Sequence, residues 1–153
     1  MTTRWMDSPI GGLRLHADGD KLVAIDFDAD DDGERADNDV LVATELQLGE
    51  YFAGERTDFD VPLAAQGTEF QHRVWDELIK VPFGETASYG DISQRLGLDR
   101  RGPRAVGTAN GRNPIPIIVP CHRIIGSDGS MTGYAGGLER KVQLLNLESP
   151  GLF

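Results

Sequence analysis

The first part of the chain alternates between apolar and polar positions in short runs. Residues 13–15 and 22–27 carry apolar side chains at alternating positions and flank the turn-forming residues Asp18-Gly19-Asp20. Alternation around an Asp/Gly turn predicts a β-hairpin. Between Val40 and Phe52 the spacing becomes helical, which predicts a helix ended by Gly54, with apolar residues at positions 42, 46, 48, 51 and 52.

The segments on either side of this helix carry weaker signals. Residues 28–39 are rich in aspartate, and we expect them to form a solvated loop. Phe59, Val61 and Leu63 alternate with other residues and predict a short extended piece. Residues 1–66 are therefore expected to form a small α/β unit, and no motif in them points to chemistry.

The second part of the chain follows helical periods. Thr68 is a candidate N-cap of a helix whose apolar face holds Phe70, Val74, Trp75, Leu78 and Ile79. Thr86 or Ser88 can cap the next helix, with Gly97 at its end, and Pro103 suits the first turn of another that runs to about residue 110. Two short helices joined by a tight turn predict a helix-turn-helix.

The remaining residues are expected to be mostly irregular. Residues 113–123 contain three prolines and predict a stiff, extended segment. Residues 126–129 predict a turn, residues 133–137 a glycine-rich loop, and residues 139–148 an amphipathic helix. The fold class is therefore α+β, with an α/β domain over residues 1–66 and a mainly helical domain over residues 67–153.

The charge is distributed unevenly between these two parts. The whole chain has a net charge of −10, which by itself argues against a nucleic-acid partner. Residues 1–66 hold 5 basic and 16 acidic residues, whereas residues 67–153 hold 10 and 9. The second part thus has a net charge of +1 and can face phosphate.

Several classes of protein are disfavoured by the composition. No apolar run approaches the ~20 residues that a membrane helix needs, and the N-terminus lacks the apolar stretch of a secretory signal. The chain has 1 cysteine and 3 scattered histidines, a set that predicts neither a disulfide nor a metal site. A single thiol fits a reducing, cytoplasmic compartment.

Cys121 is the residue whose surroundings suggest chemistry. A lone cysteine is most often a small buried apolar residue. Here a proline-rich segment precedes it, and His122 and Arg123 follow, a base and a cation of the kind that lower the pKa of a thiol. A Cys/His/acid set with Glu148 is permitted by the sequence, although each residue alone has an ordinary structural explanation.

The residues around Cys121 resemble the signature of a known family. Pro120-Cys121-His122-Arg123, within residues 113–125, is similar to the signature of the methylated-DNA–protein cysteine methyltransferases, the O6-alkylguanine-DNA alkyltransferases. Further blocks follow the family order, namely Pro82-Phe83-Gly84-Glu85-Thr86 with Ser88-Tyr89, Arg104-Ala105-Val106-Gly107, and Gly133-Tyr134-Ala135-Gly136-Gly137-Leu138. The resemblance is strong over residues 67–148 and weak before them, where it implies a ribonuclease H-like domain.

This resemblance implies direct-reversal DNA repair by irreversible, stoichiometric alkyl transfer. Cys121 is expected to accept the methyl or alkyl group from O6-alkylguanine, and the repair of O4-alkylthymine stays open. His122 is expected to deprotonate Cys121 through a water molecule, with Glu148 orienting the imidazole and Asn113 bracing the network. Tyr89 is expected to donate to the departing guanine.

The resemblance also implies contacts to the base. The carbonyl groups of Cys121 and Ile124 are expected to accept hydrogen bonds from the exocyclic amine of guanine. The backbone N–H groups at Tyr134 and Ala135 are expected to reach the guanine oxygen.

Further implied contacts are to DNA. The helix-turn-helix is expected to enter the minor groove of double-stranded DNA, with Arg104 filling the space of the flipped nucleotide. The small residues Ala105 and Gly107 allow a close approach, and Arg112 is a candidate phosphate contact. A cytoplasmic monomer without metal or cofactor is expected.

The sequence departs from the family pattern in three ways and leaves three alternative functions open. The acidic residues 28–39 have no counterpart in the family. Some members bind zinc through N-terminal cysteines and histidines, which one cysteine does not allow, and some carry serine where this chain has Ala135. The alternatives are a non-catalytic binder of alkylated DNA, against which Cys121 argues, a helix-turn-helix regulator, and a cysteine hydrolase. The regulator leaves the Pro-Cys-His-Arg segment and the glycine-rich loop without a purpose.

Overall fold

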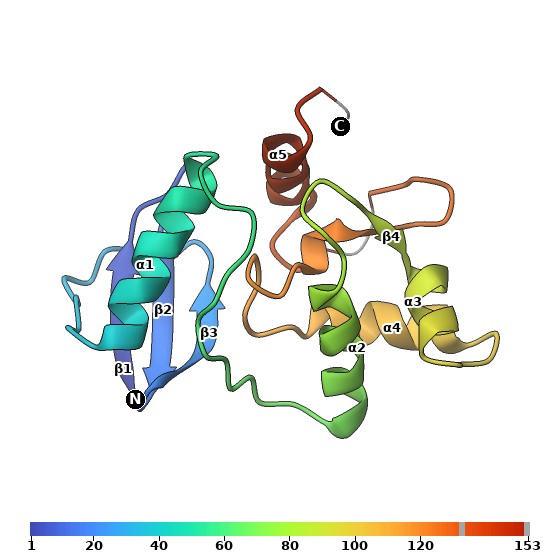
Figure 1. The fold of residues 1–153 in the computed structure, drawn as a ribbon, viewed down its shortest axis with the longest axis horizontal. Helices are drawn as coiled ribbons and strands as arrows, with labels where there is room; N and C mark the ends of the chain where they lie inside the picture. The colour runs from blue at the N-terminus through green and yellow to red at the C-terminus, as the bar shows by residue number, and fades with distance from the viewer. Residues whose placement is uncertain (132–133, 152–153) are drawn as a thin grey trace. The chain divides into compact units, whose positions relative to one another are not determined.

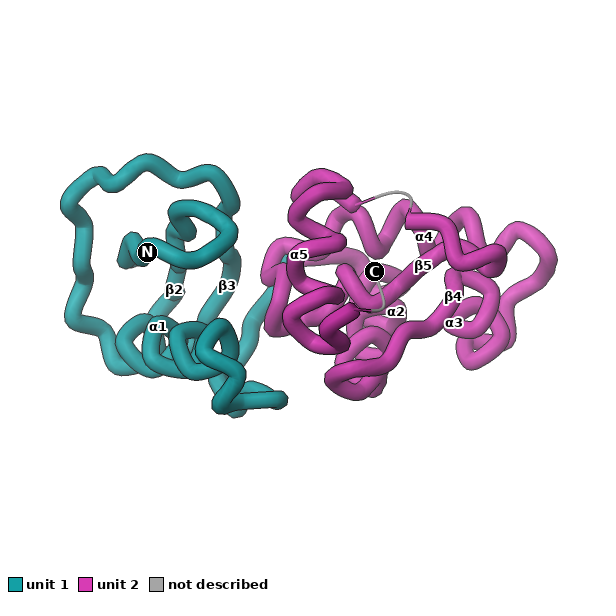
Figure 2. The backbone as a smooth tube through the Cα atoms, turned by 90° about the horizontal axis from the view of Figure 1, so that it is seen from above, with its two compact units in different colours: residues 1–66 teal, residues 67–153 magenta. Residues whose placement is uncertain are grey.

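The structure is a computed structural model that describes residues 1–131 and 134–151. The chain divides into two compact units, residues 1–66 and residues 67–153, which Figure 2 distinguishes by colour. Each unit is considered by itself below. Figure 1 gives the order of their elements along the chain.

Unit 1 is a three-stranded antiparallel sheet covered on one face by a helix (Figure 1). The strands are β1 (Thr2–Met6), β2 (Leu13–Asp18) and β3 (Lys21–Asp26), and they lie in the order of the sequence. The predicted hairpin is confirmed, since β2 pairs with β3 around Gly19, which has a φ of 61°. Strand β1 was not predicted, because residues 2–6 hold no clean apolar alternation.

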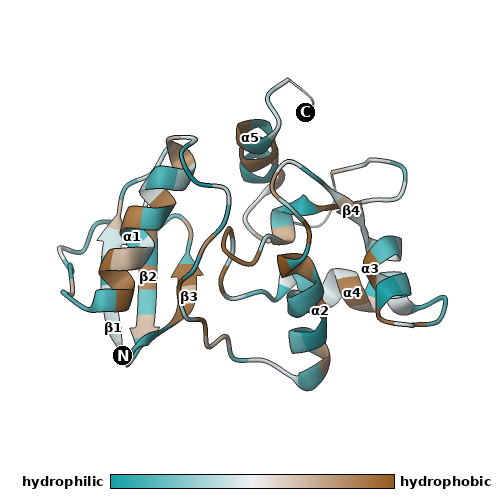
Figure 3. Cartoon of the chain, viewed as in Figure 1, coloured by the Kyte–Doolittle hydropathy of each residue, from teal (hydrophilic) through white to brown (hydrophobic). Residues whose placement is uncertain are grey.

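Helix α1 (Asp39–Phe52) begins one residue before the predicted start and ends where the sequence indicated. Asn38 caps it, because its side-chain oxygen accepts from the backbone N–H groups of residues 40 and 41. Hydrophobic and hydrophilic positions alternate along this helix in Figure 3. The predicted apolar face is partly wrong, since Val42 and Leu46 are 39% and 64% exposed while the polar Thr44 is fully buried.

The acidic stretch before α1 is an irregular segment, as predicted, but hydrogen bonds fix it to the sheet. The backbone N–H of Trp5 donates to the carbonyl of Glu34, and the Trp5 indole donates to the carbonyl of Ala29 at 2.7 Å. The Arg35 guanidinium lies 4.9 Å from the centre of the Trp5 ring. Gly12 allows this close approach, because a Cβ atom there would lie 2.1 Å from the Ala29 oxygen. The segment is therefore more ordered than its charge suggests.

Residues 59–63 form no strand, although part of the predicted extended piece is present. Leu63 forms an isolated parallel bridge with Leu22 of β3. The carbonyl of Leu22 accepts from the N–H of Ala64 at 2.8 Å. This bridge extends the sheet by a single contact.

Unit 2 begins with the three predicted helices. They are α2 (Glu69–Ile79), α3 (Tyr89–Arg95) and α4 (Gly102–Gly111). Ser88 caps α3 through a capping box with Asp91, which decides between the two candidate caps. Helices α3 and α4 pack together as the predicted helix-turn-helix. On α2 the apolar face ends earlier than predicted, since Ile79 is 50% exposed.

The prediction of an extended segment at residues 113–123 is wrong. These residues form successive tight turns followed by the 3₁₀ helix η1 (Cys121–Arg123), and residues 115–124 are all buried. The prolines exclude a strand or an α-helix, but they are equally suited to turns. Ile117 even adopts a φ of 73°, a left-handed conformation that is strained for a β-branched residue.

The chain then returns beside the start of the helix-turn-helix. Strands β4 (Ala87–Ser88) and β5 (Ile124–Ile125) form a short parallel pair that the sequence did not predict. The turn at residues 126–129 is confirmed, because the N–H of Gly129 donates to the carbonyl of Gly126 at 2.8 Å. Helix α5 (Leu138–Glu148) follows the glycine-rich loop, of which Gly133 lies outside the described residues.

A capping change tests how far α2 depends on its first residue. Thr68→Ala removes the hydrogen bond that the Gln71 N–H donates to the Thr68 hydroxyl at 3.1 Å. We expect the free energy of unfolding to fall by about 1 kcal/mol, measured by urea unfolding followed by circular dichroism. Thr57→Ala, at an exposed threonine outside the helices, is the matched control and should leave stability unchanged. Equal effects of the two changes would contradict the capping role.

Candidate active site

A tight turn and a short helix together place Cys121 in the interior of unit 2. Pro120 has φ −81° and ψ 64°, and the N–H of Cys121 donates to the carbonyl of Val119 at 2.7 Å. These values describe an inverse γ-turn, for which the fixed φ of proline is suited. Cys121 itself is only 5% exposed.

Three side chains act on the sulfur of Cys121. Burial raises the pKa of this thiol, and hydrogen bonds with the side chains of Asn113 and Tyr134 and the positive charge of Lys141 oppose the rise. The balance favours the protonated thiol at neutral pH, so a base is needed to generate a thiolate.

Asn113 also holds the turn segment together. Its side-chain oxygen accepts from the N–H of Ile115 at 3.0 Å, and its amide donates to the carbonyl of Val119 at 2.8 Å. One side chain therefore binds both ends of the loop that precedes Cys121. The role of Asn113 in bracing the catalytic network stays a prediction.

Glu148, at the end of α5, binds two side chains of η1. Its carboxylate accepts from Nε and Nη2 of Arg123 at 2.8 and 3.0 Å, and it lies 2.7 Å from Nε2 of His122. Burial opposes ionisation, but the hydrogen bonds from His122 and Arg123 outweigh it and lower the pKa of Glu148 to about 2. Glu148 is therefore ionised at neutral pH although it is only 7% exposed.

These contacts define the state of His122. Because an ionised carboxylate only accepts hydrogen bonds, Nε2 of His122 must carry the proton that it shares with Glu148. Burial lowers the pKa of His122 more than Glu148 raises it, so the ring is neutral at neutral pH. Nδ1 is buried and has no partner among the described residues, which leaves its lone pair free to accept a proton.

The structure changes which cation acts on Cys121. The sequence suggested Arg123, but its guanidinium is held by Glu148 and by the carbonyl of Val81 at 2.8 Å. Lys141 takes this place: it is fully buried, its Nζ donates to the carbonyl of Ile124 at 2.5 Å, and burial lowers its pKa to about 8. A single lysine in a helix of mixed charge gave no signal in the sequence.

Tyr89 is the first residue of α3, the first helix of the helix-turn-helix. It follows β4, whose residues Ala87 and Ser88 pair with Ile124 and the next residue of β5. A Cβ atom at Gly107 of α4 would lie 3.6 Å from the ring of Tyr89. Tyr89 and Ile124 are thus brought to the same part of unit 2.

Residues 134–137 form a turn directly before α5. The N–H of Gly137 donates to the carbonyl of Tyr134 at 3.0 Å, which forms a turn in which Ala135 is exposed. The sequence gave Tyr134 only a backbone role, whereas its side chain is buried and lowers the pKa of the Cys121 thiol. The signature of the family resemblance named the residue but not this effect.

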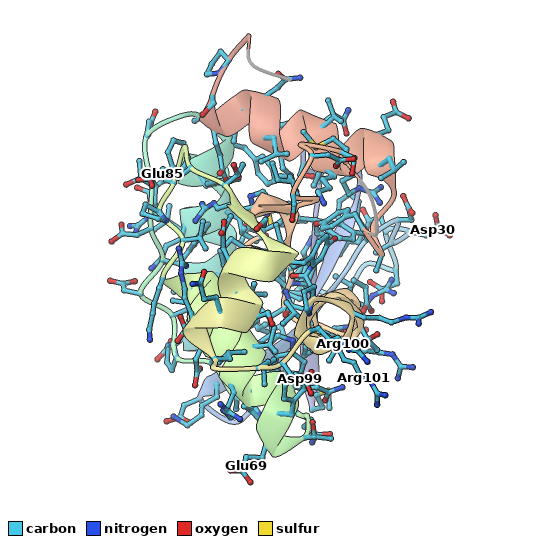
Figure 4. All side chains as sticks on the ribbon, turned by 90° about the vertical axis from the view of Figure 1, so that its right-hand side faces the viewer. Asp30, Glu69, Glu85, Asp99, Arg100 and Arg101 are labelled. Atoms are coloured by element: carbon cyan, nitrogen blue, oxygen red, sulfur yellow. The ribbon has the colours of Figure 1, made fainter. Side chains whose placement is uncertain are left out.

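The helix-turn-helix presents a strip of arginines. Between residues 95 and 112 a single acidic residue, Asp99, accompanies five exposed arginines: Arg95, Arg100, Arg101, Arg104 and Arg112. Figure 4 labels Arg100 and Arg101 beside α4. Within residues 1–131 and 134–151 none of the five forms an ion pair. Ala105 is exposed and Gly107 half-buried on the same helix. This surface therefore carries small side chains as well as the arginines.

Comparisons with known proteins agree over nearly the whole chain. A family model described as "6-O-methylguanine DNA methyltransferase, ribonuclease-like domain" matches residues 1–65, and one described as "6-O-methylguanine DNA methyltransferase, DNA binding domain" matches residues 69–150. The ribonuclease-like fold expected of the N-terminal part is thereby confirmed. No helix within the described ranges has the length and apolarity to cross a membrane.

Individual relatives carry consistent names. The methylated-DNA–protein-cysteine methyltransferase of Mycobacterium leprae is 48% identical over 95% of this chain and 90% of its own length. A constitutive methyltransferase of Bacillus subtilis with the same name is 41% identical over 93% and 92%. The crystal structure of Mycobacterium tuberculosis OGT in complex with DNA matches with a TM-score of 0.87 and 47% identity, covering 97% of this chain and 92% of that chain. The chain belongs to the 6-O-methylguanine DNA methyltransferase family.

Proposed function

We propose that this protein repairs DNA by direct reversal, moving the alkyl group of an O6-alkylguanine onto Cys121. The observation that carries the proposal is a buried thiol next in sequence to a neutral histidine, whose orientation is fixed by an ionised glutamate. The relatives named above are methylated-DNA–protein-cysteine methyltransferases, and this activity is the one that the site supports best.

The reaction is a single displacement. The thiol proton passes to His122, the sulfur attacks the alkyl carbon, and the bond between that carbon and the guanine oxygen breaks. The electron pair stays with guanine, where a hydrogen bond or proton from Tyr89 stabilises the leaving anion. The product is a thioether, and with one cysteine in the chain no second thiol resolves it. Each molecule therefore reacts once.

His122 is the base in this scheme. Its unprotonated Nδ1 accepts the thiol proton through a bridging water molecule, and Glu148 stabilises the imidazolium that results. Lys141 favours the thiolate by its charge. The side chains of Asn113 and Tyr134 also lower the pKa of the thiol and so favour the thiolate.

The alkylated guanine is held by backbone groups near Cys121. The carbonyl groups of Cys121 and Ile124 accept from the exocyclic amine of guanine, and N–H groups at Tyr134 and Ala135 donate to its oxygen. Cys121 is the first residue of η1 and Ile124 follows its last, and the side chain of a third residue, Tyr134, lowers the pKa of the thiol. The pocket therefore selects a purine that has an amine on C2 and an alkylated oxygen on C6.

The arginine strip supplies the contact with DNA. The target carbon lies inside the duplex, so the nucleotide must leave the base stack before transfer. Helix α4 enters the minor groove, where Arg104 fills the vacated space, Ala105 and Gly107 allow close approach, and Arg112 binds phosphate. The Mycobacterium tuberculosis relative has been crystallised with DNA.

The proposed function also assigns a role to residues 1–66. Residues 67–153 hold every side chain with a role in the reaction, so residues 1–66 act as a scaffold. A fragment of residues 67–153 that stays fully active would contradict that role.

We also propose that the protein is a cytoplasmic monomer. Cell fractionation tests the compartment, and sedimentation tests the oligomeric state.

An intact-mass measurement tests the activity itself. The protein is mixed with a duplex oligonucleotide that contains one O6-methylguanine, with Cys121→Ala as the control. We expect a gain of one methyl group on the natural protein, never more than one per molecule, and no gain on the variant. DNA binding without any mass gain would leave a lesion binder or a regulator as the function.

Substitution of Glu148 tests the buried carboxylate. Glu148→Gln leaves the Arg123 guanidinium without its carboxylate, and we expect the free energy of unfolding at pH 7 to fall by about 3–5 kcal/mol. The pKa of Glu148 is about 2 in the folded protein, against an ordinary 4.5. The ionised carboxylate therefore stabilises the fold fully above pH 4.5, and this stabilisation is lost as the pH falls toward 2. The stability difference from the natural protein should therefore shrink between about pH 5 and pH 3.

Urea unfolding over this pH range is the measurement. Glu139→Gln, at an exposed position of the same helix, is the matched control and should behave like the natural protein at each pH. A stability difference for Glu148→Gln that stays constant with pH would contradict the ionised state.

Substitution of Arg104 tests the flipping mechanism. Rotating a nucleotide out of the duplex costs a few kcal/mol, so Arg104→Ala should slow transfer from duplex DNA by about 10- to 100-fold. Transfer from the same lesion in single-stranded DNA should change much less. Single-turnover rates measure both, with Arg56→Ala of unit 1 as the control. An equal loss on the two substrates would assign Arg104 to phosphate binding instead.

A further inference from the structure

Two carbonyl groups of the active-site segment accept hydrogen bonds from buried side chains. Nδ2 of Asn110 donates to the carbonyl of Cys121 at 3.3 Å, and Nζ of Lys141 donates to the carbonyl of Ile124 at 2.5 Å. Asn110 is 2% exposed and Lys141 is fully buried. These are the same two carbonyls to which the proposed function assigns the exocyclic amine of guanine.

We propose that Asn110 and Lys141 are positioning residues that set the selectivity of the pocket for the guanine amine. A carbonyl oxygen has two lone pairs, so the Ile124 oxygen can accept from Lys141 and from the guanine amine at once. The Cys121 oxygen also accepts from the backbone N–H of Ile124, so the guanine amine shares a lone pair there with a donor that is already in place. The side-chain donor fixes the direction of the carbonyl before the base arrives. The inference rests on the proposed function, because it presupposes a flipped guanine in this pocket.

The incomplete hydrogen bonding of Asn110 supports this role. Its Oδ1 atom is buried and has no partner among the described residues. An unsatisfied buried acceptor is unfavourable, and an apolar side chain of similar size would avoid that penalty. Among the described residues, the side chain of Asn110 makes one hydrogen bond, the bond to the Cys121 carbonyl, so holding this group is what the amide contributes.

The place of Asn110 in the fold connects the carbonyl to the DNA-binding surface. Asn110 lies in α4, the helix that also carries Arg104 and Gly107. Trp75 of α2 donates to the carbonyl of the preceding residue, Ala109, at 2.9 Å and fixes this end of α4. The position of the Cys121 carbonyl is thereby fixed relative to α4, the helix that contacts the DNA.

Lys141 holds the second carbonyl from α5 and has a further effect on the sulfur. Its charge acts on Cys121, whereas Asn110 is not among the groups that shift the pKa of that thiol. A change at Lys141 therefore alters both the reactivity of the sulfur and the position of the Ile124 carbonyl. Asn110 is the cleaner position for a test of selectivity alone.

The experiment compares two lesions in the same duplex. One carries O6-methylguanine and the other O6-methylhypoxanthine, which lacks the exocyclic amine. Single-turnover transfer rates give the ratio of guanine to hypoxanthine for the natural protein, for Asn110→Ala and for Asn110→Leu, which has a similar shape but no donor. We expect the natural protein to prefer guanine and both variants to lower the ratio by up to about tenfold.

The ratio separates positioning from a general loss of structure. Ser93→Ala, at a buried polar residue of α3 with no bond to either carbonyl, is the matched control, and it should keep the ratio of the natural protein. Lys141→Arg retains a donor and should keep more of the preference than Lys141→Met. A variant that is merely less stable lowers both rates together and leaves the ratio unchanged.

Three results overturn the proposal in distinguishable ways. Equal rates on the two lesions in the natural protein would mean that the carbonyls do not read the amine, although methyl transfer stands. An unchanged ratio in both Asn110 variants would mean that Asn110 does not position the carbonyl. No transfer from either lesion by the natural protein would reject the proposed function and this inference together.

Discussion

The ionised carboxylate of Glu148 in the interior of unit 2 is the interaction on which the active site depends. It is bound by His122 on one side and by two nitrogens of Arg123 on the other. A buried charge is tolerated only when it is paired and hydrogen-bonded, and here the two partners are consecutive residues of η1. The short helix that begins with Cys121 is thus held to the end of α5.

This interaction explains why the charged residues around Cys121 have different roles. Arg123 neutralises Glu148, so its charge is unavailable to the sulfur, and the buried Lys141 supplies that charge instead. His122 stays neutral because burial outweighs the effect of Glu148 on its pKa. A neutral base next in sequence to a protonated thiol is the starting state that a single alkyl transfer requires.

Much of the fold was predictable because it rests on local signals. The hairpin, the caps at Thr68 and Ser88, and the helix-turn-helix follow from turn residues and spacing. Strand β1 was not predictable, since its place in the sheet depends on pairing with β2 rather than on its own pattern. The turns of residues 113–120 were missed because prolines that exclude regular structure do not distinguish an extended chain from a folded one.

The site was predictable to the extent that sequence neighbours define it. Cys121 and His122 are adjacent, and the family resemblance indicated Glu148, Asn113 and Tyr89. Contacts across long sequence separations were missed, namely Lys141 with the sulfur, Arg123 with Glu148, and Asn110 with the Cys121 carbonyl. Each depends on how α4 and α5 pack against η1, which no local pattern records.

The protonation state of His122 is the most direct test of this account. Long-range ¹H–¹⁵N spectra of the imidazole rings between pH 5 and pH 8, with His122→Gln to assign the signals, report which nitrogen carries the proton. The account predicts a neutral ring at pH 6.5, the ordinary pKa of histidine, with the proton on Nε2 toward Glu148 and none on Nδ1. A proton on Nδ1, or a titration at or above pH 6.5, would contradict the assignment of His122 as the base that activates Cys121.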